Sequence, residues 1–101
     1  MAAAYLIVES NISDPARFEA YMAAAPVVVK EFAGEYLVRG GRIEVLEGNW
    51  VPSRLTVLRY PSLDVARKMY DSPGYRAARE LRAGATALFN MVLVEGVDVP
   101  I

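Results

Sequence analysis

The stretch YLIVESNISDPARFEAYM, residues 5–22, changes from a β-strand pattern to a helical one and decides the fold. Its first four residues are all apolar, so a strand here would carry apolar side chains on both of its faces. Asp14 can accept hydrogen bonds from free N–H groups at a helix start, and Pro15 suits the first helical position. We therefore expect a strand over residues 4–10 and a helix that begins at Pro15.

The expected helix carries one continuous apolar stripe. Its members recur at helical spacing and are Phe18, Tyr21, Met22, Ala25, Val29 and Phe32. Pro26 lies within the stripe and removes one backbone hydrogen bond, but the stripe keeps its phase across it. The pattern therefore predicts a kinked helix rather than two helices, with Gly34 as its C-terminal stop.

Three further extended segments and a second helical region follow. The strands are expected at residues 35–39, 54–60 and 88–95, and residues 43–46 form either an extra strand or an extension of the second strand. The second helix is capped by Ser62 and is interrupted at Ser72-Pro73, where a new cap and first helical position are expected. The apolar stripe of this last helical segment consists of Tyr75, Ala78, Leu81 and Ala85.

This order of elements predicts an α+β fold, a ferredoxin-like β-α-β-β-α-β unit with an antiparallel sheet and both helices on one face. We expect a single domain over residues 1–101. The first and last strands are apolar on both faces, whereas an antiparallel strand with one face in water should alternate apolar and polar residues. A second copy packed on the open face of the sheet would resolve this conflict, so the sequence predicts a homodimer.

Composition excludes several classes of function. The chain has 54% hydrophobic residues and a net charge of −1, with no basic excess that would indicate a nucleic-acid partner. No apolar run approaches the roughly 20 residues of a membrane span, so no membrane partner is expected and a cytoplasmic location is the default. The chain lacks Cys and His, which removes thiolate chemistry, the usual acid/base near neutral pH and the commonest metal ligand. No metal site and no cofactor are expected.

Five ordered motifs resemble the DUF1330 family. They are Asp14-Pro15-x-x-Phe18-x-x-Tyr21, Tyr36-Leu37-Val38-Arg39-Gly40-Gly41, Glu44-Val45-Leu46-Glu47-Gly48-Asn49-Trp50, Tyr60-Pro61-Ser62 and Ser72-Pro73-Gly74-Tyr75. That family is similar to the dimeric α+β barrel proteins, which include cofactor-free quinol monooxygenases, EthD-like proteins, muconolactone isomerases and haem-dependent dismutases. The resemblance implies the fold and the dimer but no established activity. The haem-binding branch commonly uses a His ligand, so the lack of His argues against haem.

Arg39 is the first candidate ligand-binding residue. It precedes Gly40-Gly41, whose backbone N–H groups could approach an anion while the guanidinium holds a carboxylate. The alternative is a glycine turn or bulge, with Arg39 paired to Glu35 or Glu44.

Tyr70, Ser72, Tyr75 and Asn90 are the other candidates. The first three gather at the break in the second helix, where a helix N-terminus could hold an anion; alternatively Ser72 only caps and the tyrosines pack in the core. Asn90 interrupts an apolar strand and either points into a cavity, faces solvent or pairs across a dimer.

Two functions remain open from the sequence. One is a protein that binds or transforms a small metabolite in a cleft between sheet and helices, which by resemblance would be a cofactor-free monooxygenase or isomerase. The other is a non-catalytic dimerisation module whose polar residues serve structure only. Composition does not separate them, and whether the chain is an enzyme stays undecided.

Overall fold

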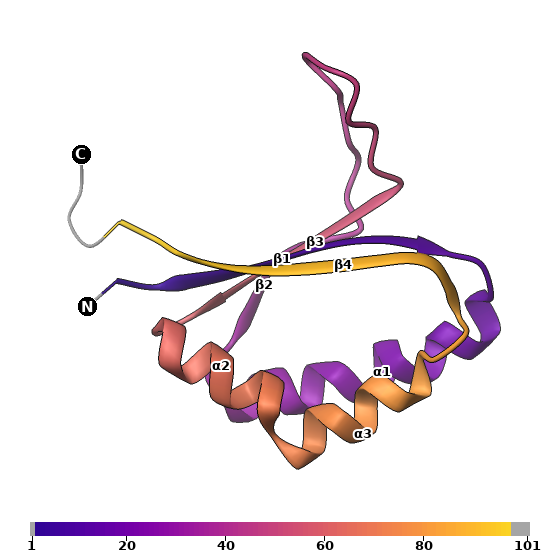
Figure 1. The fold of residues 1–101 in the computed structure, drawn as a ribbon. Helices are drawn as coiled ribbons and strands as arrows, with labels where there is room; N and C mark the ends of the chain where they lie inside the picture. Colours follow the sequence, from indigo (N-terminus) through magenta and orange to yellow (C-terminus); the bar gives the residue numbers. More distant parts are fainter. Residues whose placement is uncertain (1, 98–101) are drawn as a thin grey trace.

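The computed structural model describes residues 2–97. The elements in chain order are β1 (Ala4–Ile12), α1 (Pro15–Glu31), β2 (Glu35–Arg39), β3 (Arg54–Tyr60), α2 (Leu63–Asp71), α3 (Pro73–Leu81) and β4 (Thr86–Glu95). The four strands form one antiparallel sheet in the order β2-β3-β1-β4. All three helices cover the same face of that sheet, as Figure 1 shows. The predicted ferredoxin-like α+β fold is confirmed.

The start of each helix follows from its capping residues. The side chain of Asp14 accepts a hydrogen bond from the backbone N–H of Arg17 at 3.1 Å, and Pro15 is the first residue of α1, as predicted. Ser62 caps α2 in the same way. The helix of the apolar stripe continues through Pro26 as a single element.

Two details of the α1 C-terminus differ from the prediction. Ala33, not Gly34, takes the left-handed conformation, with φ of 58°, and the N–H of Gly34 then bonds the carbonyl of Val29. Gly34 is needed for another reason: a Cβ there would lie 2.5 Å from Cε1 of Tyr60. The glycine therefore makes room for a core ring.

The sheet has two different faces because alternate residues point to opposite sides. Toward the helices lie buried apolar side chains; with the helices they form the core, which consists of Leu6, Val8, Val28, Val29, Leu58, Tyr60, Ala66, Met69, Tyr75 and Ala78. The other face carries exposed apolar side chains, among them Val92 at 58% and Val94 at 47% exposure. We call this second side the open face.

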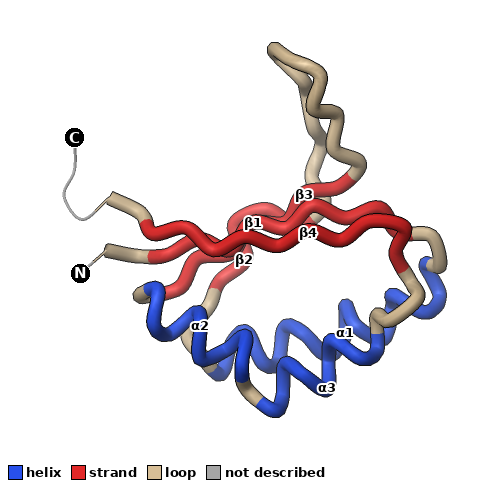
Figure 2. Tube along the Cα trace, viewed as in Figure 1, coloured by secondary structure: helices blue, strands red, loops and turns tan. Residues whose placement is uncertain are grey.

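Residues 40–53 form a long loop between β2 and β3 that projects from the open face (Figures 1 and 2). The expectation of a strand at residues 43–46 is wrong, since this segment pairs with no strand and adopts no regular structure. The loop exposes large apolar side chains, including Leu46 at 89% and Val51 at 73%. Within residues 2–97 no helix is both long enough and apolar enough to cross a bilayer.

Candidate functional site

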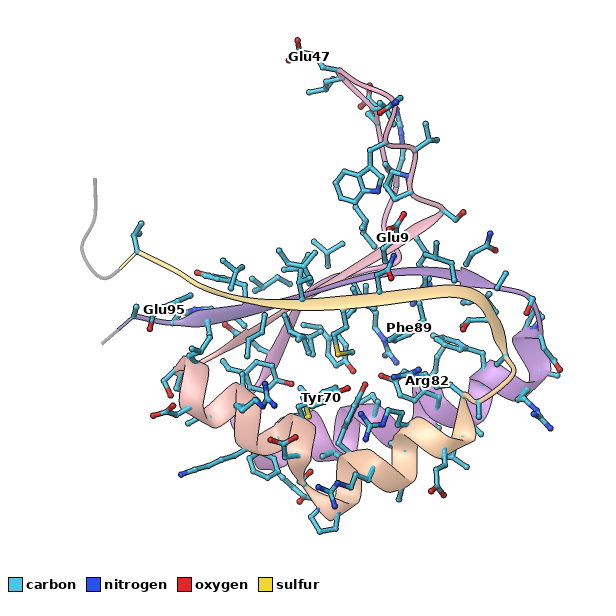
Figure 3. All side chains as sticks on the ribbon, in the orientation of Figure 1. Glu9, Glu47, Tyr70, Arg82, Phe89 and Glu95 are labelled. Atoms are coloured by element: carbon cyan, nitrogen blue, oxygen red, sulfur yellow. The ribbon has the colours of Figure 1, made fainter. Side chains whose placement is uncertain are left out.

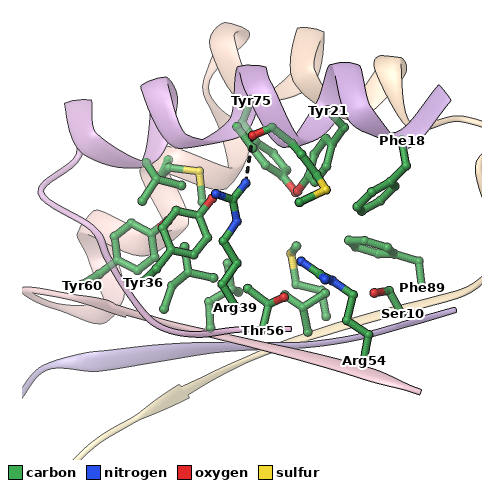
Figure 4. Close-up of a pocket in the computed structure, with 18 residues that line it drawn as sticks. Ser10, Phe18, Tyr21, Tyr36, Arg39, Arg54, Thr56, Tyr60, Tyr75 and Phe89 are labelled. Carbon is green, nitrogen blue, oxygen red and sulfur yellow. Dashed lines mark hydrogen bonds between the residues drawn. The ribbon is translucent and has the colours of Figure 1, made fainter. Parts of the chain in front are cut away.

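A cleft lies between the helix-covered face of the sheet and helices α1 to α3 (Figure 4). Its free volume is about 40 Å³, enough for a few water molecules at most. Apolar and aromatic side chains form most of its wall: Leu6, Val8, Phe18, Tyr21, Met22, Ala25, Val29, Tyr36, Leu58, Tyr60, Met69, Tyr75, Phe89 and Met91. The remaining lining residues are Ser10, Arg39, Arg54 and Thr56. Filling this cleft with a metabolite would require side chains to move.

Arg39 and Arg54 lie at the cleft from two neighbouring strands. Arg39 donates a hydrogen bond from Nη2 to the carbonyl of Met22 at 2.8 Å, and its guanidinium lies 4.8 Å from the ring centroid of Tyr36. Figure 4 shows both arginine side chains directed from the sheet toward the helices. The cleft therefore has two cationic groups on one side.

Gly40 leaves room for the Arg54 guanidinium. A Cβ on Gly40 would overlap Nη1 of Arg54, and φ at this glycine is +72°. The backbone N–H of Gly40 donates to the carbonyl of Leu55 at 2.9 Å, so it is engaged within the sheet. Gly40 thus makes room for a cleft side chain, whereas one interpretation of the sequence was that the N–H groups of Gly40-Gly41 would meet an anion.

A pair of tyrosine hydroxyls closes the helix side of the cleft. The hydroxyls of Tyr21 and Tyr75 share a hydrogen bond of 2.7 Å. Burial raises the pKa of the Tyr21 hydroxyl above its ordinary value, and the neighbouring Tyr75 raises it further. Tyr21 therefore remains neutral throughout the physiological pH range and offers a hydrogen bond rather than a charge.

Arg82 covers this aromatic group from the α3 end. Its guanidinium carbon lies 3.7 Å from the ring centroid of Phe89 and 5.3 Å from that of Tyr21. Figure 3 shows Arg82 and Phe89 between the helices and the sheet. Such stacking stabilises a cation against an aromatic face while leaving much of its charge uncompensated. Nε of Arg82 is buried and has no hydrogen-bond partner among residues 2–97.

The cleft wall is rich in adaptable side chains. Met22, Met69 and Met91 are the chain's three methionines beyond Met1, and all three line it. Methionine is unbranched and flexible, and it repacks around ligands of different shape at low energetic cost. The wall can therefore widen more readily than one built of branched side chains.

The structure separates the residues that the sequence proposed for ligand binding. Arg39 and Tyr75 line the cleft. Tyr70 lines a different, wider groove of about 270 Å³ beside β4, where Arg67 also lies. Ser72 caps α3, accepting from the N–H of Tyr75 at 3.1 Å, and donates to the carbonyl of Met69 at 2.7 Å.

Asn90 lies on the open face and not in the cleft. Its amide nitrogen donates to Glu9 at 3.4 Å, and Nε1 of Trp50 donates to the other oxygen of the same carboxylate at 3.1 Å. Asn90 therefore belongs to a polar cluster at the base of the 40–53 loop; of the alternatives that the sequence left open, the structure excludes the cavity position and leaves an exposed one. Figure 3 shows Glu9 on the side of the sheet away from the helices.

Sequence reasoning missed Arg54, Tyr21 and Arg82. Arg54 has the same strand parity as Leu58 and Tyr60, and this parity could have assigned it to the helix-covered face. Tyr21 was recognised only as part of the apolar stripe. Nothing in the spacing of Arg82, which follows the last residue of α3, indicates that it stacks on Phe89.

The match to a family model covers residues 3–97 and is described as a domain of unknown function, DUF1330. The chain belongs to the DUF1330 family. The resemblance inferred from the five motifs is therefore confirmed. A search of curated proteins gives no match to this DUF1330 chain.

Solved structures share the fold at low sequence identity. A protein of unknown function from Rhodopseudomonas palustris is 16% identical, with a TM-score of 0.74, over 97% of this chain and 85% of its own. A dimeric ferredoxin-like protein of unknown function from Bacteroides fragilis is 12% identical, with a TM-score of 0.62, over 93% and 96%. A protein from Nitrosomonas europaea, provisionally named an antibiotic biosynthesis monooxygenase, is 17% identical, with a TM-score of 0.58, over 95% and 91%. At these identities the likeness establishes the fold of the DUF1330 chain.

Proposed function

We propose that this DUF1330 protein is a homodimer that binds a small metabolite in the cleft of each subunit. The observation that carries the binding function is the composition of the cleft wall, which combines aromatic and methionine side chains with a few convergent polar groups. Ligand sites are commonly built in this way, with an apolar surface for affinity and few polar groups for orientation. Tyr21, Tyr75 and Arg39 are among the polar groups that line it.

The dimer is supported by the open face. Val92 and Val94 from β4 are half exposed there, and Val57 of β3 has the same orientation because it pairs with Ile7 of β1. Apolar sheet faces of this kind are normally covered. The loop over residues 40–53 adds exposed apolar side chains on the same side (Figure 1). The related fold from Bacteroides fragilis is described as dimeric, which favours a second copy as the cover.

An enzymatic version of this function would be a monooxygenase that acts on the bound metabolite. The structural relative from Nitrosomonas europaea carries that provisional name. Within residues 2–97 no three His, Cys, Asp or Glu residues gather as a metal site would require. The arginines and the hydroxyl groups of the lining tyrosines, Ser10 and Thr56 are the polar groups that a reaction in this cleft would use.

A second candidate function is a dimerisation module with no ligand. It is favoured by the small free volume of about 40 Å³, which is far below the roughly 300–1,000 Å³ of typical ligand pockets. It predicts that no metabolite stabilises the protein and that substitutions in the cleft alter stability alone.

Two measurements test the proposal. Light scattering coupled to gel filtration should give a mass of twice 11.1 kDa at micromolar concentration. Thermal unfolding in the presence of a metabolite library should reveal compounds that raise the melting temperature. A subunit that stays single in dilute buffer contradicts the dimer, and a library without any stabilising compound supports the module instead.

A further inference from the structure

We propose that the ligand of the cleft is a carboxylic acid with an apolar body, and that Arg39 and Arg54 hold its carboxylate. This inference rests on the binding function proposed above and specifies its ligand class. One of the two residues, Arg54, was not among the ligand-binding candidates that the sequence predicts.

The charge distribution around the cleft is one-sided. Two guanidinium groups line it, and within residues 2–97 no Asp or Glu does. The chain as a whole has twelve acidic and eleven basic residues, so composition alone does not produce this arrangement. Three of the exposed arginines outside the cleft have carboxylate partners, as in the pair of Arg59 with Glu35 at 3.2 Å, whereas neither cleft arginine has one among residues 2–97. An anion from outside the chain would form ion pairs with the two cleft arginines and neutralise their charge.

The two guanidiniums are placed in advance of binding. Arg54 projects from β3 on the same face as Thr56, two residues further along the strand. Thr56 pairs with Arg39 of β2, so the two arginines lie close together on this face. The backbone of Gly40 leaves room for the Arg54 guanidinium, and Arg39 is anchored on the carbonyl of Met22. A guanidinium has five N–H donors, so the single recorded bond of Arg39 leaves donors for a ligand. Preorganised donors lose little entropy when a carboxylate binds between them.

Polarity falls from the mouth of the cleft to its interior. Arg39 is exposed to solvent, whereas Tyr75 is only 2% exposed and Leu6 and Val8 are buried. The interior offers aromatic rings, methionines and the neutral Tyr21–Tyr75 hydroxyl pair. A ligand with a charged end and an apolar body matches this gradient when its carboxylate stays at the mouth. Movement of the three methionine side chains would supply the volume that the body requires.

The test compares acids with their uncharged amides. Octanoate and octanamide, and phenylpropionate and phenylpropionamide, are titrated into the full-length protein by calorimetry. Each acid should bind about tenfold or more tightly than its amide, since charge-assisted hydrogen bonds are roughly twice as strong as neutral ones. With isotope-labelled methionine methyl groups, the NMR signals of Met22, Met69 and Met91 should shift on binding.

Arginine variants then locate the carboxylate. Arg39→Gln and Arg54→Gln should each remove most of the preference for acid over amide. Arg76→Gln is the matched control, because Arg76 is exposed on α3 and does not line the cleft; it should leave the preference unchanged. Should either cleft variant misfold, the acid-to-amide ratio of the unmodified protein still decides the question.

The outcomes distinguish this inference from the function on which it rests. Equal binding of acids and amides, with shifts at the three methionines, overturns the carboxylate proposal and leaves a binding cleft in place. Preference for acids that survives both cleft variants also overturns it. The absence of binding by all four probes overturns the inference. If other compounds of the metabolite library then stabilise the protein, the proposed binding function stands. If no compound of the library stabilises it, the binding function is overturned as well.

Discussion

The two faces of the sheet differ although the same strands build both. On β1, Leu6 and Val8 point toward the helices and are at most 6% exposed, while their neighbours Tyr5 and Ile7 lie on the open face and are partly exposed. Both sets are apolar, so side-chain chemistry does not explain the difference in burial. Three helices of the chain cover one face, and within residues 2–97 no element covers the other (Figure 1). The difference teaches that the covered face stabilises the subunit, whereas the open face is suited to association.

Truncation of the covered face should have the largest effect. Leu58→Ala removes a side chain that is 4% exposed in the centre of the core. We expect the free energy of unfolding to fall by about 2–5 kcal/mol, because a cavity adds to the lost burial. Urea denaturation followed by circular dichroism at fixed protein concentration measures this. Val27→Ala, at an exposed position on α1 away from the open face, is the control and should change stability by less than about 1 kcal/mol; similar losses in both variants would contradict the comparison.

A charge on the open face should act on association. In the proposed dimer, Val92→Lys would bury an ammonium group between two copies, so we expect the dissociation constant of that dimer to rise by about a hundredfold or more. Analytical ultracentrifugation over a concentration series measures it, with circular dichroism to verify the fold.

The control for this variant is Val27→Lys. Val27 is 62% exposed on α1, so this substitution adds the same charge on the helix side of the molecule. It should leave the dissociation constant unchanged. If both variants dissociate the protein equally, the open face has no special part in assembly.

A substitution at Gly34 tests how tightly the core is packed at the edge of the covered face. In Gly34→Ala the added Cβ would lie 2.5 Å from a ring carbon of Tyr60 and 2.7 Å from Cγ1 of Val29. Overpacking of this kind costs about 1–3 kcal/mol. Gly41→Ala serves as the control, since a Cβ there meets nothing within 4 Å and stability should change little. Thermal and urea unfolding of the two variants should therefore separate them clearly.

The smallest effects concern buried hydroxyls on the covered face. Tyr21→Phe leaves the hydroxyl of Tyr75 without its 2.7 Å partner and should cost about 1 kcal/mol. Tyr60→Phe removes a buried hydroxyl that has no hydrogen-bond partner among the described residues, so it should be neutral or stabilising. Equal destabilisation by the two variants would contradict these assignments.

The raised pKa values of the same tyrosines predict how the stability of the protein varies at high pH. Burial raises the pKa of Tyr21 and Tyr60 in the folded protein above the ordinary value of 10.0. As the pH rises, these hydroxyls lose their protons in the unfolded chain before they do so in the folded protein. Deprotonation therefore favours the unfolded chain, and the free energy of unfolding falls as the pH rises above 10. In urea titrations between neutral pH and pH values above 10, the free energy of unfolding should fall less steeply with pH in Tyr21→Phe than in the unmodified protein. An unchanged slope would contradict the burial of this hydroxyl.

Local patterns predicted most of the fold because they depend on nearby residues. Asp14 and Ser72 cap helices where their spacing to the following residues indicated, and the stripe from Phe18 to Phe32 identified α1. Residues 43–46 have a strand composition but lack a strand partner, and pairing depends on contacts that are distant in sequence.

The site was harder to predict because it depends on which face each residue occupies. Side chains alternate along a strand, so Asn90 and Met91 point to opposite sides, and only the helix positions reveal which side holds the cleft. Arg39 and Tyr75 were identified from the sequence and line the cleft. Arg54 reaches the same cleft across a fourteen-residue interval (residues 40–53) that the sequence does not fold by itself.

Trp50 has a practical consequence for following this protein in solution. It is the single tryptophan of the chain, and its indole is held against Glu9 at the base of the projecting loop. Its fluorescence emission therefore originates on the side of the sheet opposite the cleft. A change of emission wavelength on dilution would report that subunits separate, and ligand entry beneath the helices should leave it nearly constant.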